Sequence, residues 1–168
     1  MLAKIKKQLP KLLIELVVLL VFVVALEAFL TRDAVSGKAP PFDGVTLSGE
    51  PFNLSSLQGK PAVVHFWATW CPVCRLEHGM IDSLAKDHPV ITVAMQSGEA
   101  EEVLAVLGKE EVNYPVVNDP QGTIARLYGV SGVPASFVLD ANGQVRFVTR
   151  GYTSGWGVRV RLWLAGFF

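Results

Sequence analysis

The chain has 168 residues, and its 15 lysines and arginines balance its 15 aspartates and glutamates, so that the formal net charge is zero. No basic stretch is interleaved with aromatic residues, so the composition gives no indication of a nucleic-acid partner. Roughly 135 residues follow the first apolar segment, which is enough for one domain.

Residues 12–30 form a nearly continuous apolar segment. A helix of this length would span roughly 28 Å, about the thickness of a bilayer core. Four lysines precede the segment, and the next basic residue is Arg32. Because basic residues mark the cytoplasmic flank, we expect residues 1–11 in the cytoplasm, residues 12–30 as an uncleaved transmembrane anchor and the rest outside. A cleaved signal peptide is the alternative, but its small-x-small cleavage site is not evident.

The chain beyond the anchor begins with turn-rich segments. Residues 31–41 contain glycine and prolines and are expected to form a linker that lets the following domain, residues 42–168, stand away from the membrane. Residues 42–53 are typical of a hairpin, and residues 54–59 indicate a short helical turn.

A strand–helix–strand unit follows. Residues 62–67 and 90–95 are apolar and β-branched, which predicts two buried strands. Residues 72–86 between them predict a helix, because apolar residues recur at helical spacing in Leu76, Met80 and Leu84. Such a unit implies a parallel strand pair with a right-handed crossover.

The remaining elements complete an α/β pattern. Residues 155–168 are expected to form an amphipathic helix that packs on the sheet through Trp156, Val160 and Trp163. The other predicted elements are a helix at 99–109, a strand at 114–117, a helix at 123–128, and strands at 135–140 and 144–150 joined by a turn at 141–143.

Cys71 and Cys74 are the only cysteines, so a disulfide within the chain can join only this pair. Two intervening residues close a very small ring, which suits a bond that forms and breaks rather than a structural cross-link. Cys71 would lie at the start of the helix, where free amides and the helix dipole stabilise a thiolate. We therefore expect Cys71 to be the exposed nucleophile and Cys74 the resolving thiol, with Pro72 in the first helical turn.

The two thiols have metal-binding alternatives. A structural zinc site needs four ligands, and only His65, His78 and His88 could join the thiols, at spacings unlike zinc patterns. A copper-binding module would add Met80 or His78 as a soft ligand. The pattern favours redox chemistry and no metal site, with the copper module as an alternative.

Two motifs resemble the thioredoxin superfamily: Phe66-Trp67-Ala68-x-Trp70-Cys71-x-x-Cys74 and Gly129-Val130-x-Gly132-Val133-Pro134. The anchor, the hairpin and the extra helix–strand at residues 99–117 resemble the TlpA/ResA branch, whose members are tethered thioredoxins facing the bacterial periplasm or cell exterior. The resemblance implies an α/β thioredoxin fold with an N-terminal hairpin and a central helix–strand insertion, preceded by one transmembrane helix.

The resemblance also implies site residues. Pro134 would be a cis-proline that faces the active site, which agrees with the near confinement of cis bonds to proline. Val133 would offer backbone groups to an incoming extended peptide. Trp70, Pro72 and Val73 would complete the substrate-binding surface.

The chain departs from the family pattern at two places. His65 stands where thioredoxin has a buried aspartate, and it is either a proton relay or a hydrogen-bonded core histidine. Glu77 matches a glutamate of the branch, but His78-Gly79 replaces the x-Pro that follows it there. We expect Glu77 to be partly buried beside Cys74, to raise the pKa of that thiol and to accept its proton. An exposed carboxylate is the alternative for Glu77, and His78 is expected to be solvated.

These expectations together predict a thiol–disulfide oxidoreductase that acts on disulfide-containing proteins. It needs no dissociable cofactor, because the disulfide itself carries the electrons. The resemblance favours a reductase supplied by a DsbD-like membrane thiol reductase, with a disulfide-forming oxidase as the alternative. It also implies a single-pass protein of the inner membrane whose C-terminal domain lies in the periplasm.

Overall fold

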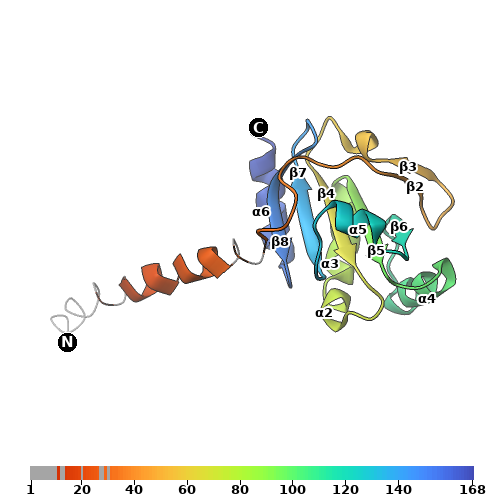
Figure 1. Cartoon of the computed structure of the whole chain (residues 1–168), viewed down its shortest axis with the longest axis horizontal. Helices are drawn as coiled ribbons and strands as arrows, with labels where there is room; N and C mark the ends of the chain where they lie inside the picture. The colour runs from red at the N-terminus through yellow and green to blue at the C-terminus, as the bar shows by residue number, and fades with distance from the viewer. Residues whose placement is uncertain (1–10, 12–13, 20, 27–28, 30) are drawn as a thin grey trace. The chain divides into compact units, whose positions relative to one another are not determined.

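The computed structural model describes residues 11, 14–19, 21–26, 29 and 31–168. The chain divides into two compact units, Met1–Arg32 and Asp33–Phe168 (Figure 1). In the first unit, the described residues up to position 29 are helical. Among all described residues, no helix is both long and apolar enough to cross a membrane. The expected anchor at 12–30 includes residues outside the described ones, so it stays a prediction.

The second unit is built on a six-stranded mixed sheet with the strand order β1-β8-β7-β4-β5-β6 (Figure 1). Strands β4, β5 and β6 are parallel, which confirms the predicted strand–helix–strand unit. Strand β7 runs antiparallel to β4, β8 to β7, and β1 to β8. The strands are β1 (Gly37–Lys38), β4 (Ala62–Trp67), β5 (Val90–Met95), β6 (Val116–Asp119), β7 (Ala135–Leu139) and β8 (Gln144–Arg150).

The helices cover both faces of the sheet. Alternate residues of β4 point to opposite faces: Val63 and Trp67 join one apolar cluster, and Val64 and Phe66 join the other. The first cluster includes side chains of α3, α4 and α6, and the second includes side chains of η1 and α5. The elements are a hairpin of β2 (Asp43–Val45) and β3 (Pro51–Asn53), η1 (Leu54–Leu57), α2 (Pro72–Arg75), α3 (His78–Asp87), α4 (Ala100–Glu110), α5 (Thr123–Leu127) and α6 (Gly155–Ala165).

The helix predicted at residues 72–86 is in fact two helices, α2 and α3. The N–H groups of Leu76 and Glu77 donate to the carbonyls three residues earlier, at 3.2 and 3.0 Å, so the chain tightens into a 3₁₀-like turn between them. Gly79, a poor helix former, follows this turn. The spacing of apolar residues places Leu76 on the buried face of a single helix. In the structure Leu76 is instead 71% exposed.

Part of the predicted linker belongs to the folded domain. Gly37–Lys38 pairs with β8 as an edge strand, and Ala39 is only 4% exposed. The N–H of Val35 donates to the carbonyl of Tyr128 at 3.2 Å. The chain is held here because the edge of β8 offers backbone groups that would otherwise lack partners. Residues 35–39 therefore do not act as a spacer.

Helix α6 packs on the sheet through the face opposite to the predicted one. Val158, Leu162 and Ala165 are buried, whereas Trp156 and Trp163 are 80% and 65% exposed. A Cβ added at Gly155 would lie 2.9 Å from the Cγ of Met80, so the start of α6 approaches α3 closely.

Leu162→Ala should destabilise the domain by about 2–5 kcal/mol, because it leaves a cavity between α6 and the sheet. The matched control is Trp163→Ala on the exposed side of the same helix, which should cost less than about 0.5 kcal/mol. Denaturant unfolding followed by circular dichroism measures both. Equal losses for the two variants would contradict the observed packing of α6.

Candidate redox site

The site lies at the carboxyl ends of the parallel strands β4 and β5. The chain leaves β4 at Trp67 and turns before α2, and the N–H of Cys71 closes this turn on the carbonyl of Ala68 at 3.2 Å. The N–H of Thr69 donates to the hydroxyl of Ser97 at 3.1 Å, which ties the turn to the end of β5. The position of the cysteines is thus set by two buried strands rather than by a mobile loop.

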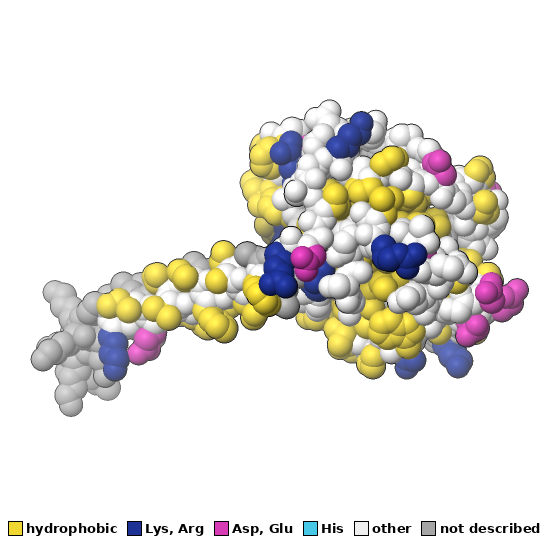
Figure 2. Space-filling model, in the orientation of Figure 1, with side chains coloured by type: hydrophobic (Ala, Val, Ile, Leu, Met, Phe, Trp, Pro, Cys, Tyr) yellow, Lys and Arg dark blue, Asp and Glu magenta, His cyan; other side chains and the backbone are white. Residues whose placement is uncertain are grey.

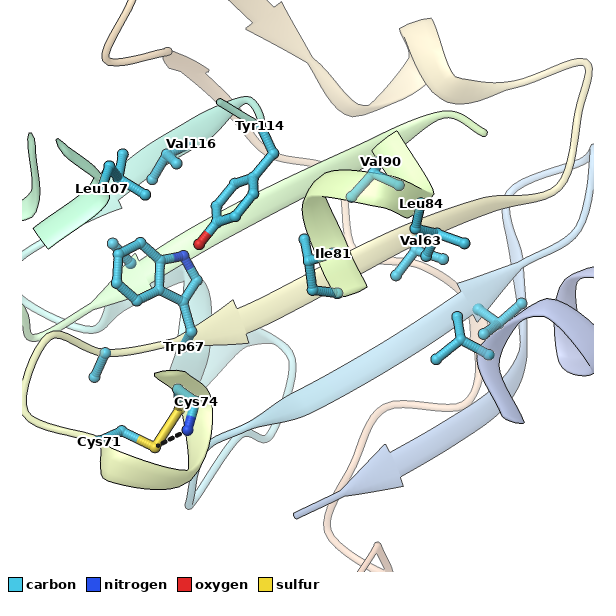
Figure 3. Packing of buried hydrophobic residues seen from close by; sticks show 14 of the residues in the cluster. Val63, Trp67, Cys71, Cys74, Ile81, Leu84, Val90, Leu107, Tyr114 and Val116 are labelled. Carbon is cyan, nitrogen blue, oxygen red and sulfur yellow. Dashed lines mark hydrogen bonds between the residues drawn. A yellow bond between two sulfur atoms is a disulfide. The ribbon is translucent and has the colours of Figure 1, made fainter. Parts of the chain in front are cut away.

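Cys71 and Cys74 form a disulfide with their Cα atoms 5.3 Å apart (Figure 3). Cys71 is the N-cap of α2, and its Sγ accepts the N–H of Cys74 at 3.1 Å. Pro72 occupies the first turn, as expected. Cys71 is 4% exposed and Cys74 is fully buried. Cys71 is more exposed than Cys74, as expected. In the disulfide form, however, Cys71 is nearly buried and not the exposed residue that the sequence predicted.

A loop that precedes β7 lies against the disulfide. The Val133–Pro134 peptide bond is cis, as the resemblance implied. The carbonyl oxygen of Val133 lies 3.7 Å from the Sγ of Cys71. The carbonyl of Pro134 accepts the N–H of Gly151 at 2.8 Å, which fixes the loop to the chain after β8. Backbone groups of this loop therefore lie beside the sulfur atom of Cys71.

An apolar rim, defined here as Trp70, Pro72, Val73 and Leu76, surrounds Cys71. Trp70 is 58% exposed, and its indole N–H donates to the carbonyl of Gln96 at 2.9 Å, so the ring is held in place. The other three side chains of the rim are also exposed. Figure 2 shows hydrophobic surface at the lower edge of the domain, over the position of α2. Leu76 was missed from sequence because its spacing indicated a buried helix face.

Glu77 is buried in the turn between α2 and α3, and its N–H donates to the carbonyl of Cys74 at 3.0 Å. It is 1% exposed, and its Oε1 accepts the N–H of Thr153. Its Oε2 lies 3.9 Å from the Nε2 of His65, close but beyond hydrogen-bonding distance. Burial raises the pKa of Glu77 to about 7, although the bond from Thr153 works in the opposite direction. A carboxyl group with this pKa can both take up and release a proton near neutral pH.

His65 is a core histidine with two polar neighbours. Its Nδ1 lies 2.9 Å from the hydroxyl of Ser136, its direct partner across β4 and β7, and its Nε2 faces Glu77. Burial and, to a lesser extent, the charge of His78 lower the pKa of His65 to about 3, so its ring is neutral at pH 7. Ser136 and Thr153 were not predicted. Ser136 could have been noticed in the sequence, since it is a polar residue inside an otherwise apolar strand.

The expectation that His78 is solvated is wrong. His78 is 3% exposed, its ring packs edge-on against Trp67 with 4.8 Å between centroids, and its Nδ1 lies 3.2 Å from the hydroxyl of Tyr114. The turn at Glu77 rotates α3 so that this position faces the core. Met80, the other soft ligand of the copper alternative, lines a surface pocket together with Trp156. Among the described residues, no group of three or more His, Cys, Asp or Glu side chains could hold a metal ion.

The fold and the Cys71–Cys74 pair beside a cis-proline loop define the class of thioredoxin-like disulfide oxidoreductases. Residues 34–157 match the Redoxin family. The chain belongs to this family.

Similar proteins agree with this class. A thioredoxin-like protein of Haemophilus influenzae is 37% identical over 98% of this chain and 99% of its own length. The thiol-disulfide oxidoreductase ResA of Geobacillus kaustophilus is 31% identical over 72% of each chain. A solved structure of a thiol:disulfide interchange protein from Chlorobium tepidum superposes with a TM-score of 0.68 and 31% identity, covering 79% of this chain and 97% of that one.

Glu77→Gln should remove a pH dependence of stability. The folded pKa of Glu77 is raised from 4.5 to about 7, so the folded state holds this proton more tightly than the unfolded state. The contribution of Glu77 to the free energy of unfolding is therefore fully present below pH 4.5 and is lost as the pH rises through about 7. This loss amounts to at most about 3 kcal/mol. Glutamine keeps an oxygen for Thr153 and does not titrate.

Guanidinium unfolding of the oxidised protein at pH 5 and pH 8 measures this effect. The wild type should lose stability between the two pH values and the Gln variant should lose less. Glu101→Gln is the control, because Glu101 is an exposed carboxylate in the first turn of α4. A Gln variant with the same pH profile as the wild type would mean that Glu77 ionises freely in the folded protein.

Proposed function

We propose that this protein reduces disulfides of partner proteins outside the cytoplasm through the Cys71–Cys74 dithiol. The observation that carries the proposal is the position of the Cys71 sulfur. It caps α2, lies 3.7 Å from the Val133 carbonyl and is surrounded by the apolar rim. An extended peptide that pairs with the Val133 backbone would place its disulfide against this sulfur while the rim covers its apolar side chains.

The reaction begins with the reduced protein. The thiolate of Cys71 attacks one sulfur of the substrate disulfide, and the S–S bond breaks to release a substrate thiolate that takes up a proton. A mixed disulfide now joins Cys71 to the other substrate sulfur. The N–H of Cys74, which bonds the Cys71 sulfur in the structure, supports the negative charge that this sulfur carries before the attack.

Cys74 completes the reaction. Its thiol loses a proton and attacks the Cys71 sulfur, which releases the second substrate thiol and leaves the Cys71–Cys74 disulfide. Glu77 is the group that we propose as acceptor of this proton, since it is buried nearby with a pKa of about 7. His65 faces Glu77 with its ring held by Ser136, and we propose it as a relay that passes the proton on without storing it, because its pKa of about 3 keeps the ring neutral.

Two features support the reducing direction. A dithiol is a strong oxidant when its reduced form is stabilised, mainly through a stable thiolate. Here α2 has only four residues, so its dipole is small, and ionised Glu77 would disfavour a nearby thiolate. Both effects weaken the reduced form relative to the disulfide, which is the property of a reductant.

The proposed setting is the outer side of the inner membrane. Residues 12–30 would be a single membrane-spanning anchor, with residues 1–11 in the cytoplasm and the domain in the periplasm. Electrons would come from a membrane thiol reductase of the DsbD type, which donates to oxidised Cys71–Cys74. Within the TlpA/ResA branch, the Cys-Pro-Val-Cys sequence and the short length most resemble suppressor of copper sensitivity protein D.

Cys74→Ser should trap the proposed intermediate. Cys71 can still attack a substrate disulfide, but no second thiol is available to release the product. Cells that express this variant should accumulate adducts that disappear on reduction, seen as slower bands on non-reducing gels. Cys71→Ser is the matched control and should form none. If instead the Cys71→Ser variant forms the adducts, the roles of the two thiols are exchanged.

The redox potential measured against glutathione or dithiothreitol assigns the direction. We expect a value at or below about −220 mV, in the range of glutaredoxins and thioredoxin. A value close to about −120 mV, as for a strong disulfide donor, would make the protein an oxidase. In the Glu77→Gln variant the potential should become less negative, because the thiolate is then easier to form.

A further inference from the structure

Helix α6 presents a second apolar face that the core does not use. Its outer face, defined as Trp156, Val160, Trp163, Leu164 and Phe167, follows the spacing i, i+4, i+7, i+8 and i+11, so these side chains lie along one side of the helix. Their exposed fractions run from 37% for Leu164 to 80% for Trp156. The rings of Trp163 and Phe167 contact each other at 4.8 Å between centroids, which continues the face past the end of the helix.

This face is unusual because the same helix is already packed on its other side. Val158, Leu162 and Ala165 are buried against the sheet and α3. A helix that is apolar on both sides is normally covered on both sides. Figure 2 shows the hydrophobic surface along the left edge of the domain, over α6. The outer face of α6 is therefore expected to contact an apolar surface that is not part of this domain.

The composition of the segment fits the surface of a phospholipid bilayer. Tryptophan and phenylalanine are the side chains that settle at the level of lipid headgroups. Residues 155–168 include Arg159 and Arg161 and contain no aspartate or glutamate. The guanidinium of Arg146 on the neighbouring β8 stacks on the ring of Phe168, 4.3 Å from its centroid. Arg159 and Arg146 are already paired with Asp87 and Asp140, at 3.2 and 2.7 Å, so the fit to a bilayer rests on the exposed aromatic and aliphatic side chains rather than on the arginines.

The chain itself keeps the domain close to a membrane, a step that rests on the membrane anchor of the proposed function. The domain begins at Asp33, and the chain is bound to it from Val35 onward. Position 30 and Val35 are five steps apart along the chain, which span at most about 18 Å when extended. If residues 12–30 cross the bilayer, the domain remains within reach of its surface and cannot stand off on a long tether.

We propose that the outer face of α6 lies on the surface of the membrane, with Trp156 and Trp163 at headgroup depth. The domain is then attached at two places, through residues 12–30 and through α6. Two attachments fix the orientation of the domain relative to the bilayer. The Cys71–Cys74 pair is thereby held at a constant height and direction, where a membrane-bound thiol donor can reach it.

Bromine-labelled lipids test this placement, because bromine quenches tryptophan fluorescence at short range. The full-length protein is reconstituted into vesicles of phosphatidylcholine and phosphatidylglycerol with bromine near the headgroup or deep in the acyl chains. Wild-type fluorescence should be quenched most by the shallow bromines. The double variant Trp156→Phe, Trp163→Phe keeps an apolar face and should lose this quenching. The control Trp70→Phe, at the redox site, should retain it.

Flotation of the same vesicles distinguishes a failure of the membrane anchor at residues 12–30 from a failure of the proposed membrane contact of α6. Protein that floats with the vesicles but shows no loss of quenching in the double variant would overturn the membrane role of α6 while leaving the anchor intact. Protein that does not float would overturn both. If Trp156 and Trp163 are shielded from iodide but not quenched by bromine, the outer face is covered by protein, either a second copy or another partner, and the proposal is wrong.

Discussion

Strand β4 is buried along its whole length, and each part of the redox site is attached to it or to a strand beside it. Its parallel neighbour β5 leads into the loop that holds Thr69 through Ser97. Its antiparallel neighbour β7 begins directly after Pro134. Because strand register fixes the position of both neighbours relative to β4, the disulfide and the Val133 carbonyl are brought next to each other by the sheet. Burial of one strand thus preorganises the site.

The same strand explains why a buried polar cluster of His65, Ser136 and Glu77 exists in the domain. A histidine in the middle of a buried strand requires hydrogen-bonding partners, since an unpaired polar group in the core is costly. Strand β7 supplies Ser136 at the paired position as the hydrogen-bonding partner of Nδ1, and the turn between α2 and α3 brings the Glu77 carboxyl group to 3.9 Å from Nε2, which is an electrostatic contact and not a hydrogen bond. The backbone of Thr153 then satisfies Glu77. The break between α2 and α3 therefore has a structural consequence, because it turns the carboxyl group of Glu77 into the core.

Much of the fold could be predicted from sequence, because the apolar runs at residues 62–67 and 90–95 and the turn at 141–143 are local signals. The cysteines and Pro134 stand in short motifs and were equally accessible. Other features depend on how elements meet. The spacing of apolar residues could not show which side of α6 fits against Met80 and α3, nor that the chain tightens at Glu77 and turns His78 inward. Ser136 becomes part of the site only through the register of β4 and β7.

The edge pairing of Gly37 with Val145 has a consequence for how the domain is made. The sheet joins the first residues of the domain to its last hairpin, and β4 pairs with β7, so that Ala62 lies opposite Leu139. Contacts of such long sequence separation form late, after nearly all of the polypeptide has been synthesised. The Cys71–Cys74 bond spans only three positions. It can open and close within one turn of the chain, so its loop-closure entropy is small and turnover need not disturb the rest of the sheet.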